Sequence, residues 1–150
     1  MSRPTTVSPG VGPSEMPAPT FRLYSLGAMI LGTFLGSMFV GLLLISRNFK
    51  ALGDEDRAHR SFWLGVGGTV AVFAAAFTLP KEVPGGAYEA VQIGVVTWYA
   101  NREQGKMIEE HKTLGGRFYS KWRAVGIGLI VTVAILLVLF CAVELGILKV

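Results

Sequence analysis

The sequence has few charged residues and a single cysteine. Charged residues make up 16% of the 150 positions and hydrophobic residues 51%, whereas soluble domains carry about 25% charged residues. This shortage of charge excludes an ordinary water-soluble enzyme domain, and the high apolar content excludes a disordered chain. With Cys141 as its one cysteine, the chain has no intramolecular disulfide and is not a disulfide-knit secreted module.

Proline is scarce outside the first 20 residues, which hold five of the seven prolines. Because proline removes backbone donors and blocks helix formation, we predict a disordered tail over residues 1–20, followed by a transmembrane helical domain over 21–150. The tail is not a signal peptide, since a polar stretch comes first and no small-residue cleavage site follows the hydrophobic run. That first run is expected to be retained as a signal anchor.

Three long runs carry no charge. They are Leu23 to Ser46, with 24 residues, Ser61 to Leu79, with 19 residues before Pro80, and Ala124 to Val143, with 20 residues. A helix of about 20 apolar residues spans a hydrocarbon core of roughly 30 Å. We therefore predict spanning helices at about 23–46, 61–80 and 122–148.

A fourth apolar segment, 85–101, contains Glu89 and Gln92. An acid at the centre of a spanning helix costs about 2.5–3.5 kcal/mol, which favours a position on the membrane surface. Glu89 lies near the start of the segment, however, where its side chain reaches the interface and the penalty falls. The segment is therefore interpreted as a fourth span, with an interfacial segment as the alternative.

The distribution of basic residues supports four spans. Loops 47–60 and 101–123 then share one side and hold 10 basic residues, against 4 elsewhere, whereas three spans give 9 against 5. Cytoplasmic loops are enriched in Lys and Arg. We predict an all-α integral membrane bundle of four transmembrane helices, with both termini exterior and loops 47–60 and 101–123 cytoplasmic. Trp63, Trp98 and Trp122 would mark the cytoplasmic interface.

Small residues recur at four-residue spacing in two of the predicted spans. Gly32 and Gly36 form a G-x-x-x-G motif, and Gly67, Ala71 and Ala75 follow the same spacing. Small residues let helix backbones approach closely in lipid. These positions are therefore candidate helix-packing residues. They either join the helices of one bundle, which is the favoured interpretation, or pair two copies of the chain through Gly32 and Gly36.

Two acids fall within predicted spans: Glu89 lies early in the span 85–101, and Glu144 lies late in the span 122–148. Carboxylates in a membrane are expensive and often functional. In the four-span arrangement both fall toward the exterior, and if they approach one another they would form a proton or cation site. The favoured interpretation is that each lies at the level of the lipid headgroups and pairs with Lys81 or Lys149.

No cofactor or metal motif is recognisable. The glycine cluster at 65–68 lacks the Lys-Ser/Thr of a phosphate-binding loop, the acids at 54–56 lack the spacing of a calcium loop, and His59 and His111 have no partner ligands nearby. We expect no enzyme activity, no cofactor, no metal and no nucleic acid. The basic loop 101–123 either attracts anionic lipid headgroups or only sets the topology.

One stretch, YSLGAMILGTFLGSMFVGLLLISRNFKALG at residues 24–53, resembles small polytopic bacterial inner-membrane proteins of unassigned function, as does WRAVGIG at 122–128. In those proteins a glycine-rich first span is followed by an Asn-x-x-x-Leu-Gly turn, here Asn48 to Gly53. The resemblance implies a multi-pass protein of the inner membrane and no activity, substrate or site residue.

The function predicted is therefore that of a small, non-enzymatic membrane protein. It would be an assembly or accessory component that packs with itself or with a larger membrane complex. The alternative is an oligomeric transporter or channel for protons or small cations, built on Glu89 and Glu144.

Overall fold

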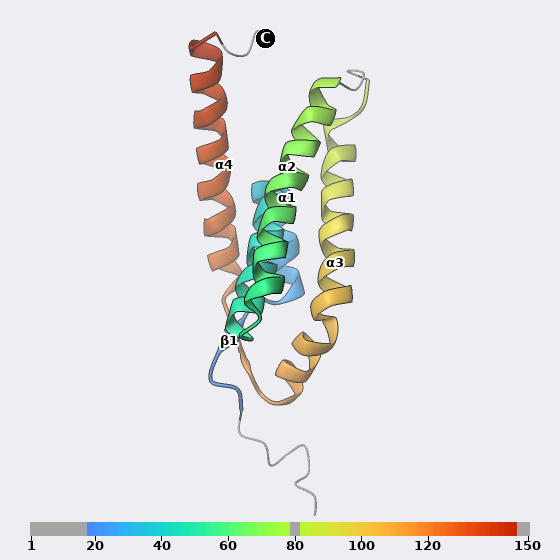
Figure 1. Cartoon of the computed structure of the whole chain (residues 1–150), viewed down its shortest axis with the longest axis vertical. Helices are drawn as coiled ribbons and strands as arrows, with labels where there is room; N and C mark the ends of the chain where they lie inside the picture. The colour runs from blue at the N-terminus through green and yellow to red at the C-terminus, as the bar shows by residue number, and fades with distance from the viewer. Residues whose placement is uncertain (1–17, 79–81, 147–150) are drawn as a thin grey trace, which may run out of the picture.

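A computed structural model describes residues 18–78 and 82–146 (Figure 1). The elements, in chain order, are β1 (Arg22–Leu23), α1 (Leu26–Ala51), α2 (Glu55–Thr78), α3 (Gly85–Thr113), β2 (Arg117–Phe118) and α4 (Lys121–Glu144). The predicted all-helical class is confirmed, and α1, α2 and α4 are each long and apolar enough to cross a membrane. Except for residues 18–20, the predicted tail lies outside the described residues, as do 79–80 and 147–148 of the predicted helices.

Three helices extend beyond their predicted limits: α1 ends at Ala51 and not at 46, and α2 and α3 are also longer than predicted. α2 begins at Glu55 because the carboxylate of Asp54 accepts the backbone N–H of Arg57 at 2.9 Å and so caps the helix. α3 continues past the apolar segment to Thr113, and its last turns carry most of its charged residues. The hydrophobic runs predicted the apolar parts of these helices but not the polar turns in which the helices begin or end.

The first helix folds back on itself. Gly36 (φ −135°, ψ 18°) and Ser37 (φ 72°, ψ 175°) break α1 into half-helices 26–35 and 38–51. The backbone N–H of Tyr24 donates to Asn48 Oδ1 at 2.7 Å, although a straight helix would separate these residues by about 36 Å. The predicted continuous span over 23–46 is therefore wrong: α1 is a helical hairpin whose tip is formed by Gly36 and Ser37.

The hairpin is the centre of the fold. α2, α3 and α4 each pack along α1 and make few contacts with one another. In Figure 1, α1 occupies only the lower and middle part of the view, whereas α2 and α4 continue to the top. The buried core accordingly lies around the hairpin, where Met29, Val40, Leu44, Ile45 and Val96 exclude solvent completely.

The hairpin places the two ends of the described chain at opposite ends of the bundle. We call the end with the 52–54 turn and β2 the basal end, and the end with residues 82–84 the distal end. α1 starts and finishes at the basal end, α2 and α4 run away from it, and α3 returns to it (Figure 1). The predicted placement of both termini on the exterior stays a prediction, since residues 1–17 and 147–150 lie outside the described residues; what the structure shows is that residue 18 and residue 146 lie at opposite ends of the bundle.

A short ladder closes the basal end. β1 and β2 pair in parallel, with Leu23 opposite Phe118, and the Tyr119 N–H donates to Leu23 O at 2.9 Å. The rings of Tyr24 and Tyr119 stack at 4.6 Å between centroids. These contacts hold the start of α1 beside the start of α4.

Candidate functional site

The hairpin tip is held by polar side chains from two neighbouring helices. The broken helix frees the Leu35 carbonyl, which accepts a hydrogen bond from Thr132 Oγ1 of α4. It also frees the Met38 N–H, which donates to Gln92 Oε1 of α3 at 2.9 Å. Non-helical backbone within a membrane is tolerated where protein groups satisfy it. Thr132 and Gln92 supply those groups, so the backbone carbonyl and N–H that the break frees are both hydrogen-bonded.

Ser37 adopts a backbone conformation that normally belongs to glycine. Its φ of 72° with ψ of 175° lies in a region that costs a residue with a side chain about 1–3 kcal/mol. Among the described residues, its buried Oγ has no hydrogen-bond partner. The tip is thus a strained turn that persists because the surrounding helices hold it in place.

Two of the predicted packing residues join the hairpin to itself and to α4. A Cβ on Gly32 would lie 3.0 Å from both Val40 Cγ1 and Leu44 Cδ1, in the other arm of the hairpin. A Cβ on Gly36 would lie 2.7 Å from the Cα of Gly128 in α4. Gly32 and Gly36 are both buried, so the structure places them in internal packing and not on a free face.

The second predicted stripe points away from the hairpin. Gly67 and Ala71 are exposed and Ala75 is half-buried, and a Cβ on Gly67 would meet nothing within 4 Å. α2 instead contacts α1 through Gly65 and Gly68, where a Cβ on either would lie within 3.1 Å of α1 side chains. Neither glycine was among the predicted packing residues. Gly65 and Gly68 continue the three- and four-residue spacing of the buried Ala58 and Ser61, which places them on one face of α2.

Beside this stripe lies an apolar groove of about 370 Å³ between α2 and α3. Ala71 and Ala75 form its wall on α2, and Tyr88 and Val91 form its wall on α3. The stripe and the groove together make a continuous face of small and apolar side chains in the distal half of the bundle.

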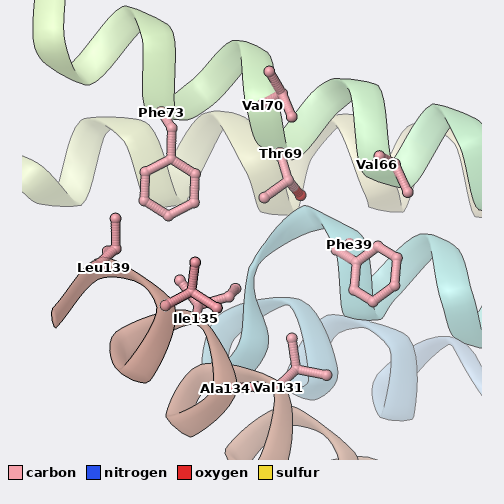
Figure 2. Close-up of a pocket in the computed structure, with 10 residues that line it drawn as sticks. Phe39, Val66, Thr69, Val70, Phe73, Val131, Ala134, Ile135 and Leu139 are labelled. Atoms are coloured by element: carbon pink, nitrogen blue, oxygen red, sulfur yellow. The ribbon is translucent and has the colours of Figure 1, made fainter. Parts of the chain in front are cut away.

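A larger groove of about 500 Å³ separates α2 from α4 above the hairpin (Figure 2). Of its ten lining residues, only Thr69 carries a polar side chain, and Phe39 of α1 lies at one end. A path for protons or cations needs polar groups or water along its length. With one polar side chain among its ten lining residues, this groove is apolar and suits hydrocarbon rather than ions.

The two candidate acids do not form a common site. Glu144 is exposed at the end of α4, whereas Glu89 is half-buried in the second turn of α3. In Figure 1, α2 lies between the end of α4 and the start of α3. Glu89 Oε1 is buried without a hydrogen-bond partner among the described residues. Glu89 and Glu144, which were predicted as the candidate pair, therefore lie apart in the structure.

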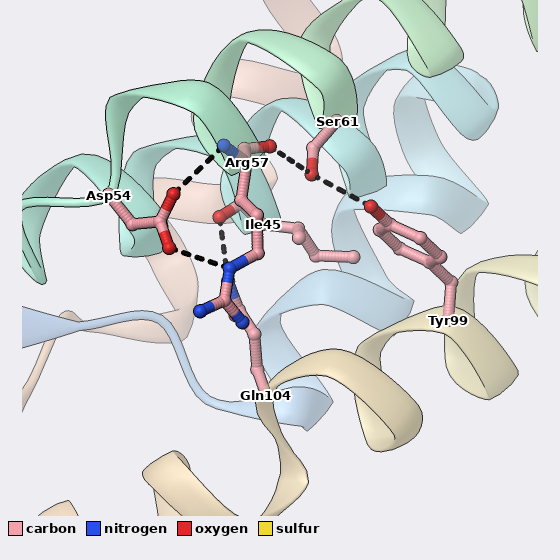
Figure 3. Close-up of polar contacts among 6 residues, drawn as sticks. All are labelled: Ile45, Asp54, Arg57, Ser61, Tyr99 and Gln104. Atoms are coloured by element: carbon pink, nitrogen blue, oxygen red, sulfur yellow. Dashed lines mark hydrogen bonds and ion pairs between the residues drawn. The ribbon is translucent and has the colours of Figure 1, made fainter.

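Amides form a second polar cluster, near the basal end. Besides the Tyr24 N–H, Asn48 contacts Tyr24 O at 2.9 Å and Gln104 Oε1 at 3.0 Å, and Gln104 Nε2 donates to Ile45 O at 2.9 Å (Figure 3). Asn48 and Gln104 are each 1% exposed. Gln92 and Gln104 lie on one face of α3, so this helix holds both the tip and the base of the hairpin.

Figure 3 also shows the contacts of the α2 start. Arg57 Nε lies 2.6 Å from Asp54 Oδ2, and Ser61 Oγ lies 3.2 Å from the Tyr99 hydroxyl of α3. The backbone N–H of Arg57, helped by its guanidinium and opposed by partial desolvation, holds the pKa of Asp54 below its usual value. These groups stabilise the end of the bundle and form no reactive pair.

Within residues 18–78 and 82–146, no three His, Cys, Asp or Glu side chains come together as a metal site would require. His59 accepts from Trp63 Nε1 at 2.8 Å, and His111 Nε2 lies 3.0 Å from Arg117 O, so each has a local structural contact. No protein-family model matches the chain, and no curated protein and no solved structure matches it either.

Proposed function

We propose that the chain is a non-enzymatic, multi-pass membrane protein that acts as an assembly component by pairing with a second copy of itself along α2. The observation that carries this proposal is the stripe of Gly67, Ala71 and Ala75. Gly67 and Ala71 are exposed, and no described residue would touch a Cβ on Gly67, whereas Ala71 and Ala75 line the groove toward α3. Its membrane placement, its orientation and its self-association rest on separate features.

The membrane placement follows from the helix directions. α2 and α4 both begin at the basal end. α3, which follows α2 and precedes α4 in the sequence, therefore crosses back to the basal end, even though its composition alone does not mark it as a span. Thr132, which contacts the hairpin tip, lies about 17 Å along α4 from Lys121, close to the middle of a 30 Å hydrocarbon core. α1 is therefore a re-entrant hairpin that reaches the middle of the bilayer, and three helices cross it.

Charge sets the orientation. All eleven basic residues of the described part of the chain lie on segments at or near the basal end: Arg22, Arg47, Lys50, Arg57, Arg60, Arg102, Lys106, Lys112, Arg117, Lys121 and Arg123. By the positive-inside rule, this end faces the cytoplasm. Residues 18–24 are then cytoplasmic and the end of α4 is exterior. A cysteine at position 20, on a Cys141→Ser background, should react only from the cytoplasmic side.

A second copy is the occupant that the α2 stripe fits best. Between helices in lipid, close backbone approach through small residues supplies the contact energy, and one helix face can meet its own copy about a two-fold axis. The adjoining groove of about 370 Å³ gives space for apolar side chains of the partner. Contact with a larger membrane complex through the same face is the competing outcome.

The test exploits the open space around Gly67. Gly67→Leu has room in the monomer and adds helix propensity, so it should leave the fold intact while it separates the two copies. Val70→Leu is the matched control, because Val70 is 63% exposed and lines the groove toward α4, whereas Ala71 and Ala75 line the groove toward α3.

Sedimentation in mild detergent should give a dimer for the parent and for Val70→Leu, and a monomer for Gly67→Leu. A parent that is monomeric both in detergent and by crosslinking in native membranes contradicts self-association. So does a dimer that persists in Gly67→Leu. A crosslink from position 71 to a different protein would assign the face to a larger complex.

A further inference from the structure

Four basic side chains gather where the starts of α1 and α4 meet. Arg22 and Arg117 are direct partners in the β1–β2 ladder, and Lys121 and Arg123 open α4. We call these four residues the basal cluster. All four are exposed, and none forms an ion pair with an acid in the described residues, where Arg57–Asp54 is the one ion pair present.

The backbone adds to this positive charge. The first turns of α1 and α4 contain no acidic residue, although helix N-termini carry partial positive charge and favour anions. Lys121 Cε and Nζ each lie 3.7 Å from the position that a Cβ on Gly27 would occupy, so the ammonium sits over the first turn of α1. A cation is unfavourable there unless an anion accompanies it.

The ladder places like charges opposite each other. Directly opposed like charges destabilise a strand pair, yet Arg22 faces Arg117 where a carboxylate would relieve the repulsion. Arg123 does not provide relief: its guanidinium lies over the Tyr119 ring at 4.5 Å from the centroid. The cluster is therefore complementary to an anion that residues 18–78 and 82–146 do not supply.

The position of the cluster indicates which anion. Trp122, directly after Lys121, is 81% exposed, and Trp63 and Trp98 on α2 and α3 are 58% and 60% exposed. Exposed tryptophans mark the level of the lipid headgroups, where phosphate groups are abundant and basic residues attract anionic lipids.

We propose that Arg22, Arg117 and Lys121 bind the phosphate of an anionic phospholipid in the leaflet at the basal end. Arg123 flanks this site and, stacked on Tyr119, keeps the wall of the site in place. The site includes Arg22, which lies before α1, and so differs from a general attraction of the 101–123 loop. It depends on membrane placement but not on pairing through α2.

The test compares two triple variants of equal charge. The first is Arg22→Gln, Arg117→Gln and Lys121→Gln. The control is Lys50→Gln, Arg60→Gln and Lys106→Gln, which removes exposed charges from the same end but outside the cluster. Neither set breaks an ion pair, and circular dichroism should show parent-like helicity for both. Lys121→Gln alone provides a milder variant.

Native mass spectrometry of the full chain, released from detergent with phosphatidylglycerol or phosphatidylcholine, gives the readout. The parent should retain phosphatidylglycerol at least tenfold more than phosphatidylcholine. A basic residue near an anionic surface contributes roughly fivefold in affinity. The cluster triple should lose retention by tenfold or more beyond the control, and Lys121→Gln should lose part of it.

Equal losses in both triples would reduce the effect to general surface charge and overturn the site. Equal retention of the two lipids would overturn it as well. Displacement of the lipid by millimolar inorganic phosphate would assign the site to a free anion, and displacement by a short oligonucleotide would assign it to nucleic acid. Either result contradicts a lipid site.

Discussion

Replacing one glycine by alanine at two positions of this bundle should change stability in opposite directions. At Gly36, a Cβ would lie 2.7 Å from the Cα and 2.9 Å from the carbonyl oxygen of Gly128. Since ordinary contacts of this kind begin at 3.4 Å, the backbone of α4 must move by about 0.7 Å or the tip must open. At Gly67, a Cβ would meet nothing within 4 Å.

The magnitudes follow from this difference. Overpacking a filled site costs about 1–3 kcal/mol, and Gly36 faces backbone, which cannot rotate away as a side chain can. Within one copy of the chain, Gly67→Ala has no such cost and gains up to about 1 kcal/mol of helix propensity. The two variants should therefore differ by about 1–4 kcal/mol in free energy of unfolding, which is roughly 5-fold to 700-fold in the unfolding equilibrium constant.

Unfolding in mixed micelles of dodecyl maltoside and increasing SDS, followed by far-ultraviolet circular dichroism, measures that difference. Gly36→Ala should unfold at a lower SDS fraction than the parent, and Gly67→Ala at an equal or higher fraction. The reasoning is refuted if both variants shift together, or if Gly36→Ala matches the parent, because α4 would then not pack against the hairpin tip at Gly128.

Three further outcomes are expected. Gln92→Leu should lower the free energy of unfolding by about 1–3 kcal/mol, because it leaves an N–H at the hairpin tip without an acceptor. Unchanged stability in the SDS titration would show that the tip does not need this hydrogen bond. The pKa of Asp54 is lowered in the folded state. The carboxylate therefore stabilises the fold fully above the usual aspartate pKa, and this stabilisation is lost as pH falls through the lowered value. Asp54→Ala should accordingly weaken the acid dependence of unfolding. Proteoliposomes with a pH-sensitive dye should show no proton flux in the parent, in Glu89→Gln or in Glu144→Gln, because the structure brings the two acids to no common site. A flux in the parent that either Gln variant abolishes would restore the transport alternative.

Hydrophobic runs are strong predictors of where this chain is helical and apolar. α2 and α4 were predicted close to their observed positions, because long apolar segments with no charge have few other stable arrangements. The return helix α3 was also predicted, although Glu89 and Gln92 interrupt its apolar segment. Gln92 has an observed role: its side chain accepts the N–H at the hairpin tip.

The reversal within α1 was not predictable from hydropathy. A run of 24 uncharged residues is compatible with one straight span or with two half-length helices, and the choice depends on partners far along the chain. Thr132 and Gln92 hold the tip, and Asn48 joins the two arms at the base. Each of these polar residues, taken alone, is unremarkable within an apolar segment.

The small-residue motifs were half informative. Spacing predicted that Gly32 and Gly36 pack against other helices, but it did not reveal that Gly32 faces the second arm of the same hairpin or that Gly128 faces Gly36. For α2, spacing selected Gly67, Ala71 and Ala75, whereas Gly65 and Gly68 make the contacts with α1. Four-residue spacing of small residues shows that one face of a helix carries small side chains, but it does not show which helix packs against that face.

The distance between the two ends of α1 tests the re-entrant hairpin most directly. Spin labels at Ser25 and Lys50, on a Cys141→Ser background in lipid nanodiscs, can be measured by double electron–electron resonance. The hairpin joins Tyr24 to Asn48 through hydrogen bonds of 2.7 and 2.9 Å, so the labels should lie at less than half the separation of a straight helix. A continuous spanning helix would place these positions about 38 Å apart, and a distribution centred near that value would contradict the hairpin.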